Sequence, residues 1–292
     1  MTCIGRFAPS PTGPLHFGSL LAAVGSYCDA RAASGQWLLR IEDIDPPRAM
    51  AGADTLILRQ LEAYGLAWDG EVLRQSTRTA AYLAALERLQ AQGDVFWCRC
   101  SRAELARLGS IVCPGNCRAF TSPRKDAALR LRVPDNSLIT FADAVFGPRQ
   151  EDVHEAAGDF VLRRRDGLFS YQLAVVVDDA FQKITRVVRG ADLLDNTARQ
   201  ILLQRRLQLP TPGYMHLPLA VNPDGSKLSK QNLATPLPLP AVPQLLWQAL
   251  HCLGQEIPAA PPALACEEIL AWGITHWRPA AIPAVPVAIT AP

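Results

Sequence analysis

His16 and Gly18 lie at the start of a predicted helix, directly after a loop rich in proline and glycine. The apolar run at residues 3–7 indicates a strand before the loop, and apolar residues at helical spacing over residues 17–28 indicate the helix. A helix start presents free backbone N–H groups and a positive dipole end to phosphate. Gly18 would let a ligand approach the backbone, and His16 could meet developing negative charge. The stretch predicts a nucleotide site, with an ordinary strand-to-helix turn as the alternative.

A second candidate phosphate-binding stretch lies late in the chain, after a predicted turn at residues 222–225. Lys227, Ser229 and Lys230 follow that turn, so two lysines flank a serine in a loop. Two ammonium groups could balance the charge of a triphosphate and of the pyrophosphate that leaves it. A solvated lysine-rich loop is the alternative interpretation of this stretch taken alone.

Four of the eight cysteines lie close together, in the pattern Cys-x-Cys, twelve residues, Cys-x3-Cys. They are Cys98, Cys100, Cys113 and Cys117. Four thiolates suit structural zinc, and a Pro-Gly pair favours a turn between the last two cysteines. We therefore expect one zinc ion per chain. Its role should be structural, because no nucleophile or base lies nearby in the sequence. Four small buried or free thiols are the alternative.

Strands and helices alternate along most of the chain, which predicts an α/β fold on a parallel sheet with right-handed crossovers. The predicted strands cover residues 3–7, 36–41, 173–177, 184–188 and 217–221. The predicted helices cover residue 17 to near Gly35, and then residues 54–64, 78–92 and 193–208. Glu42 follows one of these strands and Arg189 follows another, and the carboxyl ends of parallel strands are where such folds bind ligands.

The middle of the chain has a different pattern and predicts an insertion of short antiparallel strands. These strands are expected at residues 94–100, 128–133 and 138–146, with a hairpin around Asp166-Gly167 whose second strand is residues 169–172. The expected division is residues 1–93 and 171–235 for two halves of a catalytic domain, 94–170 for the insertion, and 236–292 for a short helical region. The tail after Arg278 is expected to fray.

The bulk composition favours a globular cytoplasmic protein. The net charge is +2, which permits a nucleic-acid partner without indicating one. Arg6 and the proline-rich loop interrupt any signal peptide, and the longest uncharged stretch, residues 231–255, contains four prolines. In the cytoplasm the cysteines are not expected to form a disulfide framework.

Together, the two candidate phosphate-binding stretches carry a family resemblance. His16-Phe17-Gly18-Ser19 resembles the first signature of class I aminoacyl-tRNA synthetases, and residues 227–231 resemble the second, Lys-Met-Ser-Lys-Ser. Residues 6–13, 40–45 and 188–194 resemble hallmark segments of the glutamyl subfamily. The resemblance covers about the first 235 residues. It implies a class I Rossmann-type sheet with an inserted acceptor-type subdomain that carries the zinc site.

The resemblance also implies a role for each candidate residue. Glutamate would be bound by Arg6, Phe7, Ala8, Pro9, Ser10, Glu42, Tyr171 and Arg189. Within this set, Arg6 would hold a carboxylate, Glu42 the ammonium group and Arg189 the side-chain carboxylate. ATP, with Mg²⁺, would be bound by His16, Gly18, Ser19, Lys227, Ser229 and Lys230. His16 and Lys230 are the expected catalytic residues. The same four cysteines would bind zinc, although the third ligand in the family is often tyrosine.

Only about sixty residues follow the second signature, where full-length glutamyl-tRNA synthetases carry a large anticodon-binding region. With the cysteine cluster, this pattern is similar to the glutamyl-Q tRNA(Asp) synthetases. That family activates L-glutamate with ATP in the absence of tRNA and transfers it to the queuosine base at the wobble position of tRNA(Asp). The alternatives are a truncated glutamyl-tRNA synthetase that charges a tRNA 3′ end, and a non-catalytic tRNA-binding relative.

Overall fold

A parallel sheet lies at the centre of the computed structural model, which describes residues 2–107, 113, 116–222, 235–257 and 263–289. Its strands are β1 (Ile4–Phe7), β2 (Gln36–Ile41), β3 (Leu73–Arg74), β9 (Arg186–Gly190) and β10 (Gly213–Leu217). β1 pairs with β2, β2 with β3 and β9 with β10, all in parallel. β1 lies beside β9, where the Thr185 N–H donates to the Ile4 carbonyl at 3.0 Å. The order β3-β2-β1-β9-β10 confirms the predicted α/β fold and places a switch point between β1 and β9.

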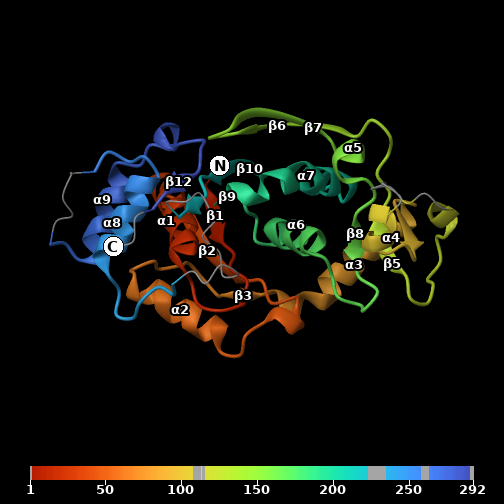
Figure 1. Ribbon diagram of the computed structural model, residues 1–292, viewed down its shortest axis with the longest axis horizontal. Helices are drawn as coiled ribbons and strands as arrows, with labels where there is room; N and C mark the ends of the chain where they lie inside the picture. Colours follow the sequence, from red (N-terminus) through yellow and green to blue (C-terminus); the bar gives the residue numbers. More distant parts are fainter. Residues whose placement is uncertain (1, 108–112, 114–115, 223–234, 258–262, 290–292) are drawn as a thin grey trace.

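Helices from both ends of the chain cover one face of this sheet (Figure 1). α1 (Phe17–Ala32) packs on the strands, and α8 (Pro243–Cys252) and α9 (Cys266–Thr275) pack on α1. Residues of α2 (Ala53–Ala63) join the same apolar cluster. A Cβ on Gly25 of α1 would lie only 2.5 Å from a methyl group of Leu217, so glycine lets this helix cross β10 closely.

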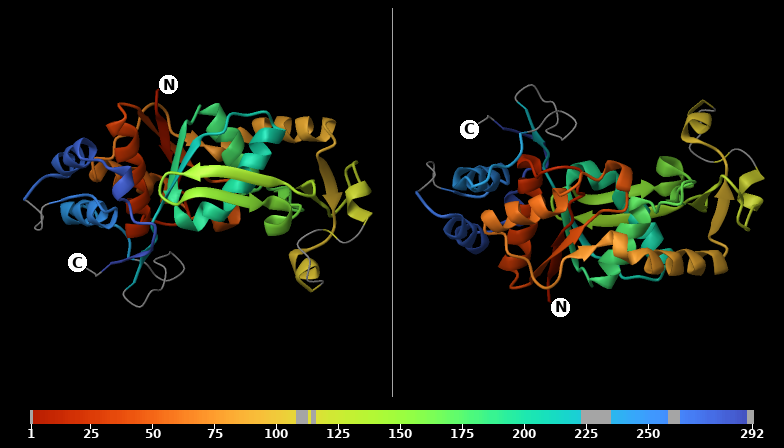
Figure 2. Two further views of the ribbon diagram at one scale, coloured as in Figure 1. Left: turned by 90° about the horizontal axis from the view of Figure 1, so that it is seen from above. Right: turned by 90° about the horizontal axis from the view of Figure 1, so that it is seen from below.

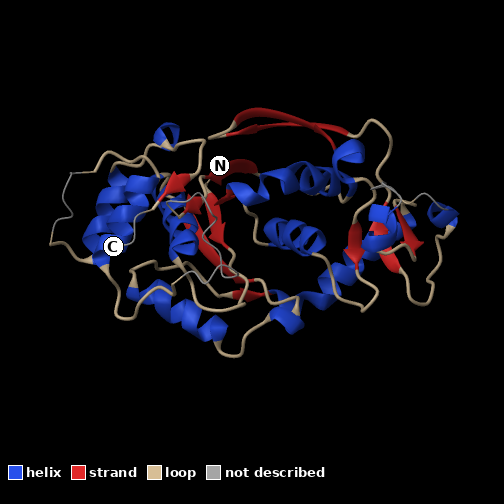
Figure 3. Ribbon diagram, in the orientation of Figure 1, coloured by secondary structure: helices blue, strands red, loops and turns tan. Residues whose placement is uncertain are grey.

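The opposite face is covered by α3 (Thr79–Ala91), α6 (Tyr171–Phe181) and α7 (Thr197–Arg206). In Figure 3 these helices lie on the side of the central strands opposite to α1. Successive residues of β9 point to different faces, because Val187 belongs to the cluster under α6 and α7, and Val188 to the cluster under α1. Both faces of the sheet are therefore buried, and the strand ends are where sheets of this kind bind ligands.

The end of the molecule farthest from α8 and α9 carries a small antiparallel sheet (Figure 2). It consists of β4 (Val95–Cys98), β5 (Ala128–Leu131) and β8 (Val161–Arg163), with α4 (Arg102–Arg107) and α5 (Val153–Ala157) nearby in the chain. A long hairpin, β6 (Leu138–Asp143) and β7 (Gly147–Asp152), runs from this end back to the central sheet. There β6 pairs in parallel with β10 at Asp143 and Tyr214.

Several predicted elements are wrong. Residues 173–177 form part of α6 rather than a strand, because Ser170 accepts a hydrogen bond from the Leu173 N–H and caps a helix. The second strand of the expected hairpin, residues 169–172, is only a single bridge at Phe169, since Tyr171 already begins α6. The expected helix at 193–208 opens with a 3₁₀ turn, Ala191–Asn196.

Two further boundaries differ from the prediction. The expected strand at 217–221 is divided between the end of β10 and β11 (Ala220–Val221). The part of the tail after Arg278 that the structure describes does not fray, because β12 (Val287–Ala288) pairs with β11. In the part of the chain that the structure describes, no helix is long and apolar enough to cross a membrane.

Candidate active site

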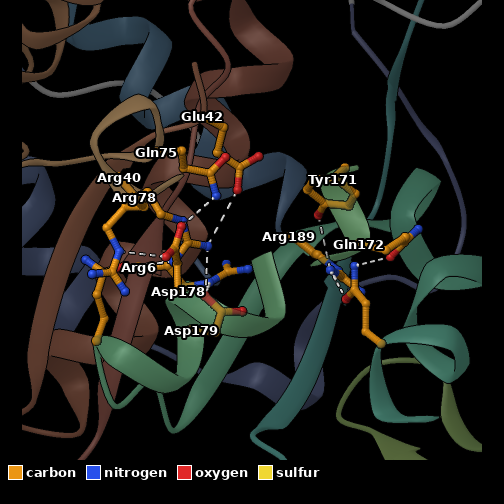
Figure 4. A network of polar contacts seen from close by, with 12 residues as sticks. Arg6, Arg40, Glu42, Gln75, Arg78, Tyr171, Gln172, Asp178, Asp179 and Arg189 are labelled. Atoms are coloured by element: carbon orange, nitrogen blue, oxygen red, sulfur yellow. Dashed lines mark hydrogen bonds and ion pairs between the residues drawn. The ribbon is translucent and has the colours of Figure 1, made fainter. Parts of the chain in front are cut away.

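A cluster of buried charges lies where β1 and β2 end (Figure 4). Arg6 Nε donates to Asp179 Oδ1 at 3.1 Å, and Arg6 Nη1 donates to the Val188 carbonyl at 3.3 Å. Arg40 Nη2 lies 2.8 Å from the same Asp179 oxygen and 3.5 Å from Glu42 Oε1. Asp179 therefore holds two arginines from neighbouring parallel strands, and Glu42 lies beside them at the end of β2.

The two carboxylates of this cluster differ in their pKa. Burial favours the neutral acid at Asp179, but the guanidinium groups of Arg6 and Arg40 outweigh it and lower its pKa. At Glu42 burial dominates over Arg40 and Arg6 and raises the pKa. Glu42 Oε1 is buried and accepts no hydrogen bond from the described residues. An ammonium group would supply the donor that this oxygen lacks.

Asp178, the neighbour of Asp179, belongs to a separate network. It accepts hydrogen bonds from Gln75 Nε2 at 3.0 Å, Arg78 Nε at 3.1 Å and the Tyr82 hydroxyl at 2.6 Å. These donors lie on and just before α3, so Asp178 fixes α6 to α3 behind the charged cluster.

Arg189, at the end of β9, is 5% exposed and donates only to neutral groups. Its Nε donates to His216 Nε2 at 3.0 Å, and its Nη1 to Gln200 Oε1 at 2.7 Å and the Tyr171 hydroxyl at 3.4 Å. Its Nη2 donates to Thr197 Oγ1 at 2.9 Å and to the Leu193 carbonyl at 3.3 Å. Among the residues that the structure describes, no carboxylate pairs with this guanidinium.

The first candidate phosphate-binding stretch borders a cavity of about 310 Å³ at the end of β1. His16 is the N-cap of α1, and the cavity continues to the residues after β10. The lining includes Phe7, Pro9, Ser10, His16, Gly18, Ser19, Gly190, Asp192, Leu217, Pro218, Leu219 and Ala220. Ala8 is half-buried between the lining residues Phe7 and Pro9. The Pro9 carbonyl accepts from the Glu42 N–H at 3.0 Å, which ties this stretch to the end of β2. Lys227, Ser229 and Lys230 lie outside the described residues.

Four cysteines converge beside the small antiparallel sheet of β4, β5 and β8, here called the distal sheet, and their sulfur atoms all lie within 4.8 Å of one another. Sγ–Sγ distances are 3.7 Å for Cys98–Cys113, 3.4 Å for Cys100–Cys113 and 4.0 Å for Cys100–Cys117. A tetrahedral zinc ion with Zn–S bonds of about 2.3 Å needs sulfur atoms about 3.8 Å apart. The cluster therefore fits a metal such as zinc, as the spacing predicts.

The structure brings together Arg6, Glu42, Tyr171 and Arg189 from four separate segments (Figure 4). The sequence interpretation did not single out the residues that hold them, which are Arg40, Asp179, Thr197, Gln200 and His216. One signal was available for two of these, because Arg40 and His216 are polar residues inside apolar strands and a buried polar side chain requires partners.

Comparisons with known proteins agree on one family. Residues 3–239 match the family model of tRNA synthetases class I (E and Q), catalytic domain. The chain is 53% identical over 280 residues to the glutamyl-Q tRNA(Asp) synthetase of Ectopseudomonas mendocina, covering 96% of this chain and 95% of that protein. It is 54% identical over 291 residues to the protein of the same name from Thiobacillus denitrificans, covering 98% and 96%.

Among solved structures, the glutamate-tRNA synthetase from Elizabethkingia anophelis is similar, with a TM-score of 0.80 and 23% identity. The match covers 100% of this chain and 68% of that one. At this identity the likeness concerns the fold, which is the arrangement of strands and helices described above.

Proposed function

Because the chain belongs to the glutamyl-Q tRNA(Asp) synthetases, a family of class I synthetases, we propose that it activates L-glutamate with ATP and transfers the glutamyl group to tRNA(Asp). The resemblance found in the two signatures is thereby confirmed at the level of the family. The finer proposal is that activation needs no tRNA and that the acceptor is the queuosine base at the wobble position.

The charge of Arg189 is the observation that best supports glutamate as the substrate. In the charged cluster, Arg6 and Arg40 are balanced by Asp179 and Glu42. Arg189 is buried and has only neutral partners among the described residues, so no carboxylate there pairs directly with its guanidinium. Glutamate carries two carboxylates and one ammonium group, and its side-chain carboxylate would supply the direct ion-pair partner that Arg189 lacks.

Each charge of the substrate then has a partner. The side-chain carboxylate pairs with Arg189 and displaces the long contact to the Tyr171 hydroxyl at 3.4 Å. The ammonium group donates to Glu42 Oε1, which has no other hydrogen bond in the described structure. Arg6 binds the reacting carboxylate from the end of β1.

Activation is adenylate formation, in which the glutamate carboxylate attacks the α-phosphorus of ATP and pyrophosphate leaves. This chemistry depends on alignment and charge neutralisation, for which no protein nucleophile is needed. ATP, accompanied by Mg²⁺, occupies the cavity at the start of α1, with His16, Gly18 and Ser19 facing its phosphates. Lys227, Ser229 and Lys230 act on the triphosphate, with Lys230 and His16 as the catalytic residues.

The cysteine cluster has a structural role in this proposal. Cys98, Cys100, Cys113 and Cys117 would hold zinc, which would cross-link the segments around β4 in an inserted subdomain, residues 94–170. Residues 1–93 and 171–235 then form the catalytic domain, residues 236–292 a short helical region, and the enzyme works in the cytoplasm.

One experiment tests the activation and the acceptor separately. We expect glutamate-dependent ATP–pyrophosphate exchange in the absence of any tRNA. We also expect transfer of labelled glutamate to tRNA(Asp) that carries queuosine, and none to tRNA(Asp) that lacks it. Exchange that requires tRNA(Glu), or charging of tRNA(Glu) alone, would instead identify a glutamyl-tRNA synthetase.

A further inference from the structure

We propose that His216 and Asp143 are positioning residues for glutamate recognition, which orient the Arg189 guanidinium while leaving its charge free for the substrate. The inference rests on the proposed function, because it takes Arg189 as the residue that binds the side-chain carboxylate. Neither His216 nor Asp143 touches the substrate in this proposal.

The hydrogen bonds around His216 determine its tautomer. Arg189 Nε can only donate, so His216 Nε2, 3.0 Å away, is the acceptor and carries no proton. The proton of the neutral ring is then on Nδ1, which donates to Asp143 Oδ2 at 2.6 Å. All three side chains are buried. The line Asp143–His216–Arg189 is therefore a directed chain of hydrogen bonds with one consistent arrangement of protons.

Asp143 is itself held in place at the end of β6. Its Oδ1 accepts from the Val145 N–H at 3.0 Å and from the Phe146 N–H at 2.9 Å. Asp143 is also the residue at which β6 pairs with β10, opposite Tyr214. The long β6–β7 hairpin thus contributes to the glutamate end of the site through one carboxylate that lies behind the ring of His216.

A histidine suits this place better than a carboxylate would. A carboxylate in contact with Arg189 would pair with the guanidinium and compete with the substrate for it. The neutral imidazole orients Nε without neutralising it, and the negative charge of Asp143 stays one ring farther away. Burial, together with the nearby charge of Arg189, lowers the pKa of His216 against the effect of Asp143, which keeps the ring neutral.

Two substitutions of His216 separate its two hydrogen bonds. His216→Gln places a carbonyl oxygen near the position of Nε2 and can still accept from Arg189. His216→Asn places an amide near Nδ1 and can still donate to Asp143, but it is too short to reach Arg189. Asp143→Asn keeps an acceptor but allows the other tautomer of His216, which presents a proton to Arg189.

Tyr214→Phe is the matched control. It lies on the same strand as His216 and removes one buried hydrogen bond, from Gln204 Nε2 to the Tyr214 hydroxyl at 3.0 Å. This bond does not involve Arg189. The control therefore shows how far the loss of a buried hydrogen bond in β10 changes the KM values when the hydrogen bonds of Arg189 are kept.

The assay is glutamate-dependent ATP–pyrophosphate exchange by the full-length zinc-loaded protein, with melting temperatures for every variant. For His216→Asn we expect the KM for glutamate to rise about tenfold or more, with the KM for ATP within about twofold of wild type. His216→Gln should restore the KM for glutamate to within about threefold, and Asp143→Asn should raise it about fivefold. Tyr214→Phe should leave both KM values unchanged.

Equal effects of His216→Asn and His216→Gln, or equal changes in the KM for glutamate and for ATP, would overturn the proposal. An unchanged KM for glutamate in Asp143→Asn would remove Asp143 from it. If His216→Asn does not fold, the comparison of His216→Gln, Asp143→Asn and Tyr214→Phe decides the matter. Arg189→Met tests the premise separately, because an unaffected KM for glutamate there would contradict the proposed role of Arg189 itself.

Discussion

Binding and stability make opposite demands on the carboxylate of Glu42. Burial raises its pKa in the folded protein despite the nearby guanidiniums of Arg40 and Arg6. For an acid with a raised pKa, the stability contribution is fully present below the unfolded pKa and is lost as the pH rises through the folded pKa. The ionised side chain is therefore the less favourable form for the fold, and it is the form that binds an ammonium group.

This conflict gives a prediction for Glu42→Gln, which is close in shape and carries no charge. At pH 7 we expect a melting temperature equal to or above that of wild type. We also expect the KM for glutamate in pyrophosphate exchange to rise at least about tenfold, because the charged partner of the ammonium group is lost.

The pH dependence provides the check on Glu42. The stability difference between Glu42→Gln and wild type should shrink as the pH falls and Glu42 becomes neutral. A variant that melts well below wild type at pH 7, or one that binds glutamate normally, would show that Glu42 serves the fold rather than the substrate.

At the level of single residues, the sequence predicts the side chains that would meet the substrate better than those that hold them. Glu42 and Arg189 follow predicted strands, and their positions could be inferred from the geometry of a parallel sheet, whereas Arg6 was singled out by the family resemblance. Asp179 and His216 become meaningful only when segments distant in the chain pack together. Their partners are 173 and 27 residues away, respectively. A one-dimensional pattern does not contain these pairings.

At the level of elements, Gln60 of α2 ties the residue before α1 to the chain at residue 237. Its Oε1 accepts from the Leu15 N–H at 2.8 Å, and its Nε2 donates to the Leu237 carbonyl at 2.8 Å. The Leu237 N–H also donates to the Leu15 carbonyl at 2.7 Å. One buried carboxamide thus connects the residue before His16 to the chain that follows the second signature.

Gln60→Leu should therefore affect both stability and ATP binding. It leaves two buried backbone groups without partners, and we expect a loss of about 3 kcal/mol in the free energy of unfolding, measured by urea denaturation. The KM for ATP should rise more than the KM for glutamate, because Leu15 precedes His16.

Glu62→Ala is the matched control on α2, since Glu62 is exposed and should change stability by less than about 0.5 kcal/mol. If Gln60→Leu is as stable as this control, the two hydrogen bonds of Gln60 do not hold the site together.

Helix α6 shows where the interpretation of elements from sequence fails. Residues 173–177 are all apolar, and a continuous apolar run has no period that separates a buried strand from a buried helix. The contacts of Asp178 and Asp179 fit a helix, on which the side chains of consecutive residues point about 100° apart. Asp178 can therefore face α3 while Asp179 faces β1 and β2. The exposed strand β7 was missed for the opposite reason, since its residues are mostly polar and lack a strand-like alternation.

At the level of the whole molecule, the two chemical centres lie far apart. The candidate active site belongs to the central sheet, whereas the cysteine cluster includes Cys98 of β4, in the distal sheet at the end away from α8 and α9 (Figure 2). Phe96, Cys98 and Cys113 form a small core of their own, separate from the two large apolar clusters of the central sheet. Loss of the metal should therefore loosen one end of the molecule without dismantling the other.

We predict that Cys117→Ser lowers the zinc content below the one ion per chain that we propose, because three thiolates and a hydroxyl form a weaker site. Cys3→Ser, outside the cluster, is the control and should retain the metal. Pyrophosphate exchange by the zinc-poor protein should stay within about threefold of wild type, while calorimetry shows an additional unfolding transition at lower temperature. No cysteine of the cluster belongs to the charged network around Arg6 and Arg189. If the rate of exchange nevertheless declines in proportion to the zinc content, the distal sheet must support the active site indirectly.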